Sequence, residues 1–293
     1  MFEQDGNISI PVSCILRETG SKELQVEEQV CKKLSAYIGR FSCVMIAPDD
    51  IEIINSAGGT LRRRFLDTIL CQTSSDYLNA LQKYNKLMVQ RNSLLREFNR
   101  PDGKKDTELL DIYDQQLVTA GISIYEARKK LAVELEPLVM EQYRELAGEP
   151  DGIQIIYKSQ LAYDDFAQLL KHSRNRDIAA QRTTCGVHKD DMEITMMDAP
   201  LRLAASQGQK KTMLLALKLT ELKMLKDYLG TTPILLLDDM FERLDQQRVS
   251  RLLKLVTGKE GGQVFITDTN EAQLKKHLEA HDADFSILRL KES

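Results

Sequence analysis

The chain has 293 residues, which is room for one large domain or two smaller ones at roughly 100–200 residues per domain. Apolar residues make up 42% and charged residues 29%, a composition that excludes a disordered or low-complexity protein. No apolar run approaches about 18 residues, so no membrane-spanning helix is predicted, and the first residues do not resemble a signal peptide. Five widely spaced cysteines favour reduced thiols in a cytoplasmic protein. The net charge of −4 restricts nucleic-acid binding to local basic patches.

The first part of the chain predicts short strands. Residues 7–17 and 22–27 alternate weakly between apolar and polar, which indicates a β-hairpin, and residues 31–39 are predicted as a short helix. The apolar run 41–47 ends at Pro48, so it is predicted as a buried strand followed by a turn.

The middle of the chain predicts two long helices. Residues 61–98 contain neither Pro nor Gly, and their apolar side chains follow a 4-3 spacing in which Arg91 is the exception. A second stretch, 110–138, keeps the same alternation with Glu134 as its exception, and Pro137 is predicted to kink or end it. Two such rows predict an antiparallel helical hairpin, and the alternative is two helices of an ordinary bundle. The spacing rests on these residues: Tyr77, Leu81, Tyr84, Met88, Leu95 and Phe98 in the first row, and Leu110, Tyr113, Leu117, Ala120, Ile124, Ala127, Leu131 and Leu138 in the second.

From residue 153 onward, strands and helices alternate. Strands that are apolar throughout and separated by helices predict an α/β sheet with helices on both faces. The hairpin is therefore predicted as an insertion, residues 59–150, between two parts of one α/β unit, residues 1–58 and 151–293. The predicted strands are 153–157, 192–197, 233–238, 263–267 and 284–290, and the predicted helices are 161–172, 207–229, 245–256 and 271–281.

The first candidate site is an acid pair, Asp238 and Asp239, that ends an apolar strand. Such a pair lies at the carboxyl edge of the sheet, where open α/β folds bind ligands. Mg²⁺ takes one or two carboxylates together with phosphate oxygens and water, and a second acid can orient an attacking water. The alternative is that both acids only cap the following turn.

The second candidate site is the segment Ser206–Thr212, which opens the helix 207–229. Ser206 can cap this helix, whose free N–H groups and dipole attract anions, and Gly208 permits close approach of a phosphate. The alternative is an ordinary N-cap. The segment precedes Asp238 by 32 residues, enough for one helix, a turn and a strand, and this spacing links the two candidates.

Together these segments carry a family resemblance. Ser206–Gln209 resembles the signature motif of ABC-type ATPases, Ile234–Asp239 their Walker B strand, and Leu244–Asp245 their D-loop. Within the ABC/SMC-type superfamily the chain is similar to the RecF family of DNA replication and repair ATPases, from about residue 41 to its end. Gly186–Asp191 resembles that family's Gly-Pro-His-Arg-Asp-Asp motif, with Val187 and Lys189 substituted. Further resembling segments are 47–51, 62–67, 84–86 and 90–95.

The resemblance implies an ABC-type head with an inserted helical lobe and ATP and Mg²⁺ as cofactors. It implies that Asp238 assists Mg²⁺ and that Asp239 is the catalytic carboxylate. It also implies an ATP-dependent homodimer, because ATP favours the state in which two half-sites meet. The roles implied for other residues are these: Ser206, Gln207, Gly208 and Gln209 contact the ATP held by the other subunit, Asp245 lies at the dimer interface, and His188, Lys189 and Asp190 form a family-motif site.

The same resemblance implies slow ATP hydrolysis in the full-length form, binding of single- and double-stranded DNA, and recombinase loading at gaps in DNA. The implied setting is DNA damage repair with the SOS response, in the cytoplasm, with RecR and RecO as partners and no membrane association.

One motif of the family is not found in the sequence. A GxxxxGK[ST] loop, whose backbone cradles the β-phosphate, does not occur in the 293 residues. Family members carry it upstream of the point where this sequence starts, so the 293-residue chain is expected to hydrolyse little or no ATP alone. A non-catalytic DNA-binding or scaffold remnant of an SMC-like ATPase is the alternative.

Basic residues predict where DNA could bind. Contacts to phosphates would be independent of DNA sequence and sensitive to salt. The alternative for each residue is a solvated helix face. The candidates are Arg62, Arg63, Arg64, Lys83, Lys86, Arg91, Lys104 and Lys105.

Overall fold

The computed structural model describes residues 2–4, 8–17, 20, 22–31, 37–98, 100, 106–148, 152–239, 246–258, 262–281 and 284–289. The chain forms two compact units, Met1–Ser42 and Cys43–Ser293. The domain boundaries predicted near residues 58 and 150 stay predictions. Several other predictions fall outside the described residues: Lys104, Lys105, the D-loop pair Leu244 and Asp245, and most of the helix 31–39.

The smaller unit is built of antiparallel strands. Its β3 and β4 pair in register from Val12 opposite Val26, which confirms the predicted hairpin. The next turn places Glu27 and Glu28 at positive φ (53° and 65°), as a two-residue turn between twisted strands requires. The strands are β1 (Phe2–Gln4), β2 (Ile8–Ile10), β3 (Val12–Leu16), β4 (Lys22–Val26) and β5 (Gln29–Val30).

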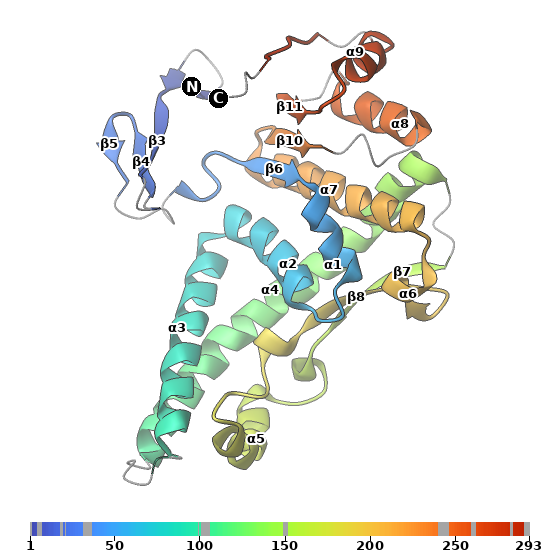
Figure 1. Ribbon diagram of the computed structural model, residues 1–293. Helices are drawn as coiled ribbons and strands as arrows, with labels where there is room; N and C mark the ends of the chain where they lie inside the picture. Colours follow the sequence, from blue (N-terminus) through green and yellow to red (C-terminus); the bar gives the residue numbers. More distant parts are fainter. Residues whose placement is uncertain are drawn as a thin grey trace. The chain divides into compact units, whose positions relative to one another are not determined.

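The larger unit contains a parallel sheet with strand order β11-β10-β6. Its strands are β6 (Cys43–Ile46), β10 (Ile234–Asp238) and β11 (Val264–Thr267), and helix α7 (Gln207–Leu229) packs on one face (Figure 1). Alternate side chains, such as Leu235 and Leu237, point into this buried core. This parallel arrangement brings the carboxyl ends of the three strands to one edge.

The other face of this sheet carries an apolar row across all three strands. Leu236 lies opposite Met45 on one neighbour and opposite Phe265 on the other. Met45 and Phe265 are 45% and 47% exposed. The two faces of the sheet are therefore buried to very different degrees in the described residues.

A long helical arm leaves the sheet (Figure 1). It is formed by α3 (Ser75–Phe98) and α4 (Thr107–Ala147), which run side by side as the predicted hairpin. The predicted helix 61–98 is interrupted, because α2 (Thr60–Thr73) ends before Ser74, whose hydroxyl accepts a hydrogen bond from the Tyr77 N–H.

Helix α4 belongs both to the arm and to the core beside the sheet. Its first half packs on α3 through Leu117 and Ile124, and its second half packs near α7 through Leu135 and Val139. Pro137, which is predicted to kink or end the helix, lies inside α4, so the helix does not end there and the kink stays a prediction. Over its 41 residues α4 is about 60 Å long and links the arm rigidly to the core.

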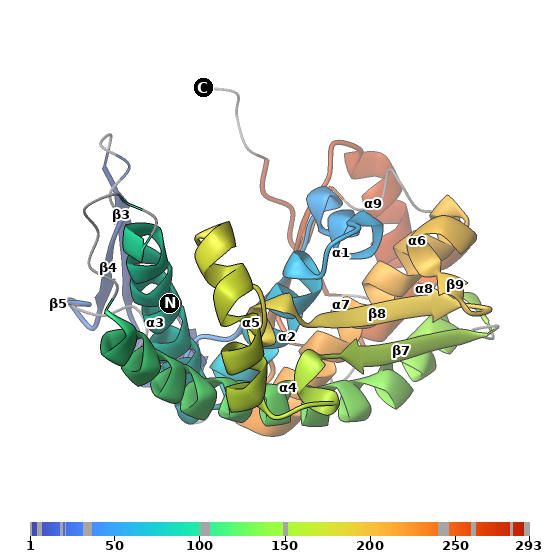
Figure 2. The same ribbon diagram turned by 90° about the horizontal axis from the view of Figure 1, so that it is seen from below.

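A second, antiparallel sheet of order β7-β8-β9 lies beside α4 (Figure 2). The strand predicted at 284–290 is not formed, since residues 284–289 pair with no strand among the described residues. The helix predicted at 161–172 begins later, at the cap residue Asp165. The remaining elements are α1 (Glu52–Asn55), β7 (Ile153–Lys158), α5 (Phe166–Ala180), β8 (Asp191–Met196), β9 (Ala199–Pro200), α6 (Leu201–Ala204), α8 (Gln246–Val256) and α9 (Glu271–Glu279), with 3₁₀ turns at Pro48–Ile51, Gln160–Ala162 and Val187–Lys189. Among the described residues, no helix combines the length and the apolar character needed to cross a lipid bilayer.

The close crossing of α4 and α5 gives a stability prediction at Gly121. A Cβ on Gly121 would lie 2.4 Å from Cε1 of the buried Phe166. Gly121→Ala is expected to destabilise the protein by about 1–3 kcal/mol through overpacking, although Ala normally stabilises a helix interior by about 1 kcal/mol. Urea unfolding measures the difference. Gly58→Ala, which meets nothing within 4 Å, is the control, and a stabilising Gly121→Ala would contradict the prediction.

Candidate functional site

The acid pair lies where the sequence predicts it, at the carboxyl edge of the parallel sheet. Asp238 is the last residue of β10, and Asp239 follows it with φ of 49°, in the left-handed region. One carboxylate oxygen of Asp239, Oδ1, is buried and has no hydrogen-bond partner among the described residues. A buried, unsatisfied carboxylate oxygen is costly unless a cation or a water completes it, so this edge suits a hard cation such as Mg²⁺.

The described residues contain no group of three or more His, Cys, Asp or Glu side chains able to hold a metal alone. Two carboxylates therefore fit a cation that takes its other ligands from phosphate and water, as Mg²⁺ does. In that arrangement Asp238 would hold the ion, with the carboxylate of Asp239 nearby, and the ion would neutralise charge on the phosphate oxygens.

Sequence reasoning missed a third residue at this edge, Thr267. It ends β11, directly opposite Asp238, and its hydroxyl donates to Asp238 Oδ1 at 2.6 Å. The available signal was a polar side chain at the end of a strand that neighbours the acid pair. That signal is weak, because the sequence does not show which strands are neighbours.

The segment at the start of α7 forms a complete capping box. The Ser206 hydroxyl accepts a hydrogen bond from the Gln209 N–H at 3.3 Å, and the Gln209 side chain accepts one from the Ser206 N–H at 2.8 Å. The N-cap alternative for Ser206 is thus confirmed, and it is compatible with anion binding because Ser206 and Gln207 remain exposed. The first turn contains no acid, so nothing in it opposes the attraction of the helix dipole for an anion.

Gly208 has a contact that explains the absence of a side chain there. A Cβ on Gly208 would lie 3.2 Å from a guanidinium nitrogen of Arg248 on α8. The glycine therefore lets the guanidinium of Arg248 approach the N-terminus of α7.

The signature segment and the acid pair point the same way but do not meet within one chain. The turn between Leu229 and Ile234 reverses the chain, so α7 runs antiparallel to β10. Helix α7 has 23 residues and is about 35 Å long, whereas β10 has five residues and is about 17 Å long. Ser206 therefore extends roughly 15–20 Å beyond the edge where Asp238 lies.

The Gly186–Asp191 segment is embedded between the arm and the second sheet. His188 Nε2 faces the Thr183 carbonyl at 3.2 Å, and its Nδ1 lies 2.9 Å from the Tyr84 hydroxyl. Burial lowers the pKa of His188 to about 4. Asp190 is 1% exposed and bonded to the Tyr157 hydroxyl, and burial raises its pKa.

An arginine from α4 ties the same segment to α2. Arg128 donates to the Val187 carbonyl at 2.8 Å and makes a two-point ion pair with Asp67 at 2.8 and 3.0 Å. Lys189 alone of the three predicted motif residues is exposed. The geometry therefore gives His188 and Asp190 a structural place, and leaves Lys189 available to a ligand.

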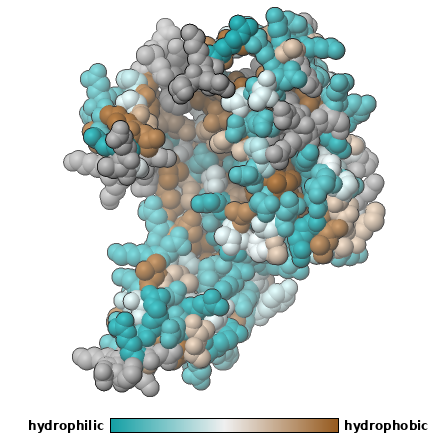
Figure 3. Space-filling view, in the orientation of Figure 1, coloured by the Kyte–Doolittle hydropathy of each residue, from teal (hydrophilic) through white to brown (hydrophobic). Residues whose placement is uncertain are grey.

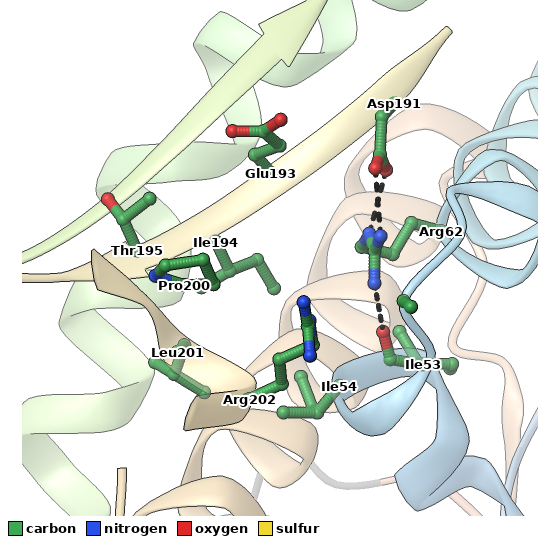
Figure 4. A pocket seen from close by; sticks show the side chains of 11 residues that line it. Ile53, Ile54, Arg62, Asp191, Glu193, Ile194, Thr195, Pro200, Leu201 and Arg202 are labelled. Carbon is green, nitrogen blue, oxygen red and sulfur yellow. Dashed lines mark hydrogen bonds and ion pairs between the residues drawn. The ribbon is translucent and has the colours of Figure 1, made fainter. Parts of the chain in front are cut away.

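Two of the predicted DNA-contacting residues are buried in ion pairs. Arg62 is 7% exposed and donates to both oxygens of Asp191, at 2.7 and 2.8 Å, beside a pocket of about 140 Å³ (Figure 4). Arg91 is fully buried and pairs with Asp114 and Asp177, at 2.6 and 2.8 Å. Neither guanidinium can reach a DNA phosphate in this structure, so both are removed from the DNA-contacting set.

The remaining described candidates are accessible to different degrees. Arg63 is half-buried and donates to the Asp190 carbonyl, while Arg64 on α2 and Lys83 and Lys86 on α3 are exposed. Hydrophilic side chains predominate over α3 on the face seen in Figure 3. Arg64, Lys83 and Lys86 therefore remain candidates for DNA contact in the described part of the chain.

The fold and the site together define a class. A parallel sheet whose central strand ends in two acids, a Ser-capped helix leading into that strand, and an inserted helical arm form an ABC-type ATPase head.

Comparisons with known proteins identify the family within this class. The chain is 39% identical over 279 residues to the DNA replication and repair protein RecF of Parabacteroides distasonis, covering 95% of this chain and 75% of that protein. It is 35% identical to the RecF of Phocaeicola vulgatus, covering 99% and 77%. The solved structure of the recombination mediator protein RecF-ATPrS in the RecFOR pathway superposes with a TM-score of 0.78 at 31% identity, covering 90% of this chain and 71% of that one. The RecF-ATP structure also gives 0.78, at 28% identity over the same shares of the two chains. No family model matches the chain. The chain belongs to the RecF family of DNA replication and repair proteins.

Proposed function

We propose that the protein works as a RecF-type DNA repair and replication ATPase that dimerises around ATP. The observation that carries this proposal is the separation of two half-sites on one chain. The signature segment at Ser206 and the acid pair at Asp238 face the same side, yet they lie roughly 15–20 Å apart along it. A second head supplies the missing half of each site.

In the dimer, each half-site does a different part of the work. The first turn of α7, with Ser206, Gln207, Gly208 and Gln209, would bind the γ-phosphate of the ATP held by the other subunit, aided by the positive end of the helix dipole. Asp238 holds Mg²⁺ and Asp239 orients the attacking water. Mg²⁺ supplies charge neutralisation on the phosphate oxygens when it is bound. Asp245, outside the described residues, is assigned to the dimer interface.

DNA binding is proposed for the exposed basic residues. Arg64, Lys83 and Lys86 would contact phosphates of single- or double-stranded DNA without reading the base sequence. Lys104 and Lys105 remain candidates outside the described residues, and Lys189 joins them as the exposed member of its motif. The proposed role is recombinase loading at gaps, in the cytoplasm, with RecR and RecO as partners, in keeping with the RecFOR pathway that the solved RecF structures represent.

Nucleotide-dependent association of the chain with a related RecF protein tests the proposal. The 293-residue chain is mixed with the RecF protein of Parabacteroides distasonis, with and without a non-hydrolysable ATP analogue, and association is followed by sedimentation velocity. A nucleotide-dependent mixed dimer is expected for the native chain and lost in Ser206→Arg. Asp227→Arg, exposed at the opposite end of α7, is the matched control. An association that ignores both nucleotide and Ser206→Arg would favour the non-catalytic scaffold alternative.

Hydrolysis by the chain alone gives a separate prediction. The 293 residues contain no GxxxxGK[ST] loop, so the purified chain is expected to show no ATP turnover above background. A phosphate-release assay measures this. Turnover that Asp239→Asn abolishes would contradict the expectation.

A further inference from the structure

Thr267 is the centre of a small hydrogen-bond cluster at the carboxyl edge of the parallel sheet. Its hydroxyl donates to Asp238 Oδ1 at 2.6 Å, and the Asp239 N–H lies 3.3 Å from the same hydroxyl oxygen. A threonine hydroxyl has one proton and two lone pairs, so it can donate to the carboxylate and accept from the amide at once. The Thr267 side chain therefore contacts the carboxylate of Asp238 and the backbone N–H of Asp239.

The backbone of Asp239 is held in an unfavourable conformation by the same residue. A φ of 49° costs a non-glycine residue roughly 1–2 kcal/mol, so the surrounding contacts must maintain it. The Asp239 N–H donates to the Thr267 carbonyl at 3.2 Å in addition to approaching its hydroxyl. Thr267 thus supplies both acceptors that face this amide.

The consequence concerns the direction of the two carboxylates. The hydroxyl engages Oδ1 of Asp238 and thereby fixes the direction of this carboxylate. At Asp239, which follows with positive φ, Oδ1 is buried and meets no hydrogen-bond partner in the part of the chain that the structure describes. Neither orientation follows from the acids themselves, because an aspartate at a strand end can adopt more than one staggered rotamer.

We propose that Thr267 is a positioning residue: it orients the Asp238 carboxylate for binding a divalent cation and fixes the backbone of Asp239 beside it. This inference rests on the proposed function, in which Asp238 holds Mg²⁺ and Asp239 orients the attacking water. A purely structural role, in which Thr267 only ties the ends of β10 and β11 together, would affect stability without affecting cation affinity.

The test uses Mn²⁺ as the probe, titrated into the whole 293-residue chain and followed by electron paramagnetic resonance. Outer hydrogen-bond partners of metal ligands typically contribute about 10–100-fold in affinity, so Thr267→Val is expected to weaken Mn²⁺ binding about tenfold or more. Thr267→Ser keeps the hydroxyl and is expected to bind within about twofold of the native chain. Asp238→Asn shows the Mn²⁺ affinity that remains when the Asp238 carboxylate is removed.

Thermal unfolding of each variant separates positioning from folding. If Thr267→Val unfolds the chain, Thr267→Ala replaces it, with the same expected loss of affinity. Native affinity in a folded Thr267→Val or Thr267→Ala variant would overturn the positioning role and leave the proposed function intact. A native chain whose Mn²⁺ binding is absent, or is unchanged by Asp238→Asn, would overturn both the positioning role and the proposed metal site.

Discussion

Replacing Arg91 with methionine is expected to lower the free energy of unfolding by about 3–5 kcal/mol, because it removes one partner from a buried ion-pair cluster. The Arg91 guanidinium is fully buried between Asp114 and Asp177, and it also donates to the Thr183 hydroxyl at 2.9 Å. Asp177 is itself fully buried, so the substitution leaves a carboxylate with no compensating charge beside it.

The control for this prediction comes from the same helix. Arg96 on α3 is exposed, and Arg96→Met is expected to change stability by no more than about 0.5 kcal/mol. Arg91→Lys keeps the charge but cannot span two carboxylates with a planar fork, so it is expected to fall between the two. Chemical denaturation measures all three variants, and a loss below about 1 kcal/mol for Arg91→Met would show that the cluster contributes little.

The burial of Arg91 affects what its substitution can show about DNA binding. A weakened DNA affinity in an Arg91 variant would follow from loss of the arm's packing, because the Arg91 guanidinium is fully buried. Lys83 and Lys86 are exposed on the same helix, so their substitution would test the proposed DNA contact without disturbing this cluster.

The arm shows what helical spacing can and cannot predict. The 4-3 row correctly indicates a long helix packed along one side, and Tyr84 and Leu95 are buried in it. Arg91 interrupts that row, and the sequence alone favours a solvated residue there. Its partners lie 23 and 86 positions away, so only the folded chain shows that a charge in an apolar row is neutralised from two other helices.

The candidate site shows the same division. Asp238 and Ser206 are predictable because each lies at the end of an element whose periodicity the sequence reveals. Thr267 is not, since its role depends on the pairing of β10 with β11. The same limit explains why the strand predicted at 284–290 is wrong, because an apolar run forms a strand only where a neighbouring strand offers hydrogen bonds.

The buried histidine of the Gly186–Asp191 segment gives the second large prediction, a loss of stability in mild acid. The Thr183 carbonyl can only accept a hydrogen bond, so Nε2 of His188 carries the proton and Nδ1 accepts from the Tyr84 hydroxyl. Burial opposes a second proton, and the nearby positive charges of Lys189 and Arg63 act in the same direction, which lowers the pKa from its ordinary 6.5 to about 4.

The sign of the effect follows from the proton count. The unfolded chain binds a proton at His188 as the pH falls through 6.5, whereas the folded chain does so only near 4. The stability linked to His188 is therefore fully present above pH 6.5 and is lost as the pH falls towards 4, by about 3 kcal/mol in total. Asp190 acts in the opposite sense, because its raised pKa lets the folded state take up a proton earlier as the pH falls.

A comparison of variants isolates the histidine from the acid. His188→Gln cannot titrate, and the difference between its unfolding free energy and that of the native protein is expected to shrink or reverse by about 3 kcal/mol between pH 7 and pH 4. Both proteins keep Asp190, so its contribution cancels to first order. His172→Gln, at an exposed position on α5, is the matched control and should run parallel to the native curve. If His188→Gln also runs parallel to it, the buried imidazole is protonated without cost, and the segment that joins the arm to the second sheet is more open to water than its packing indicates.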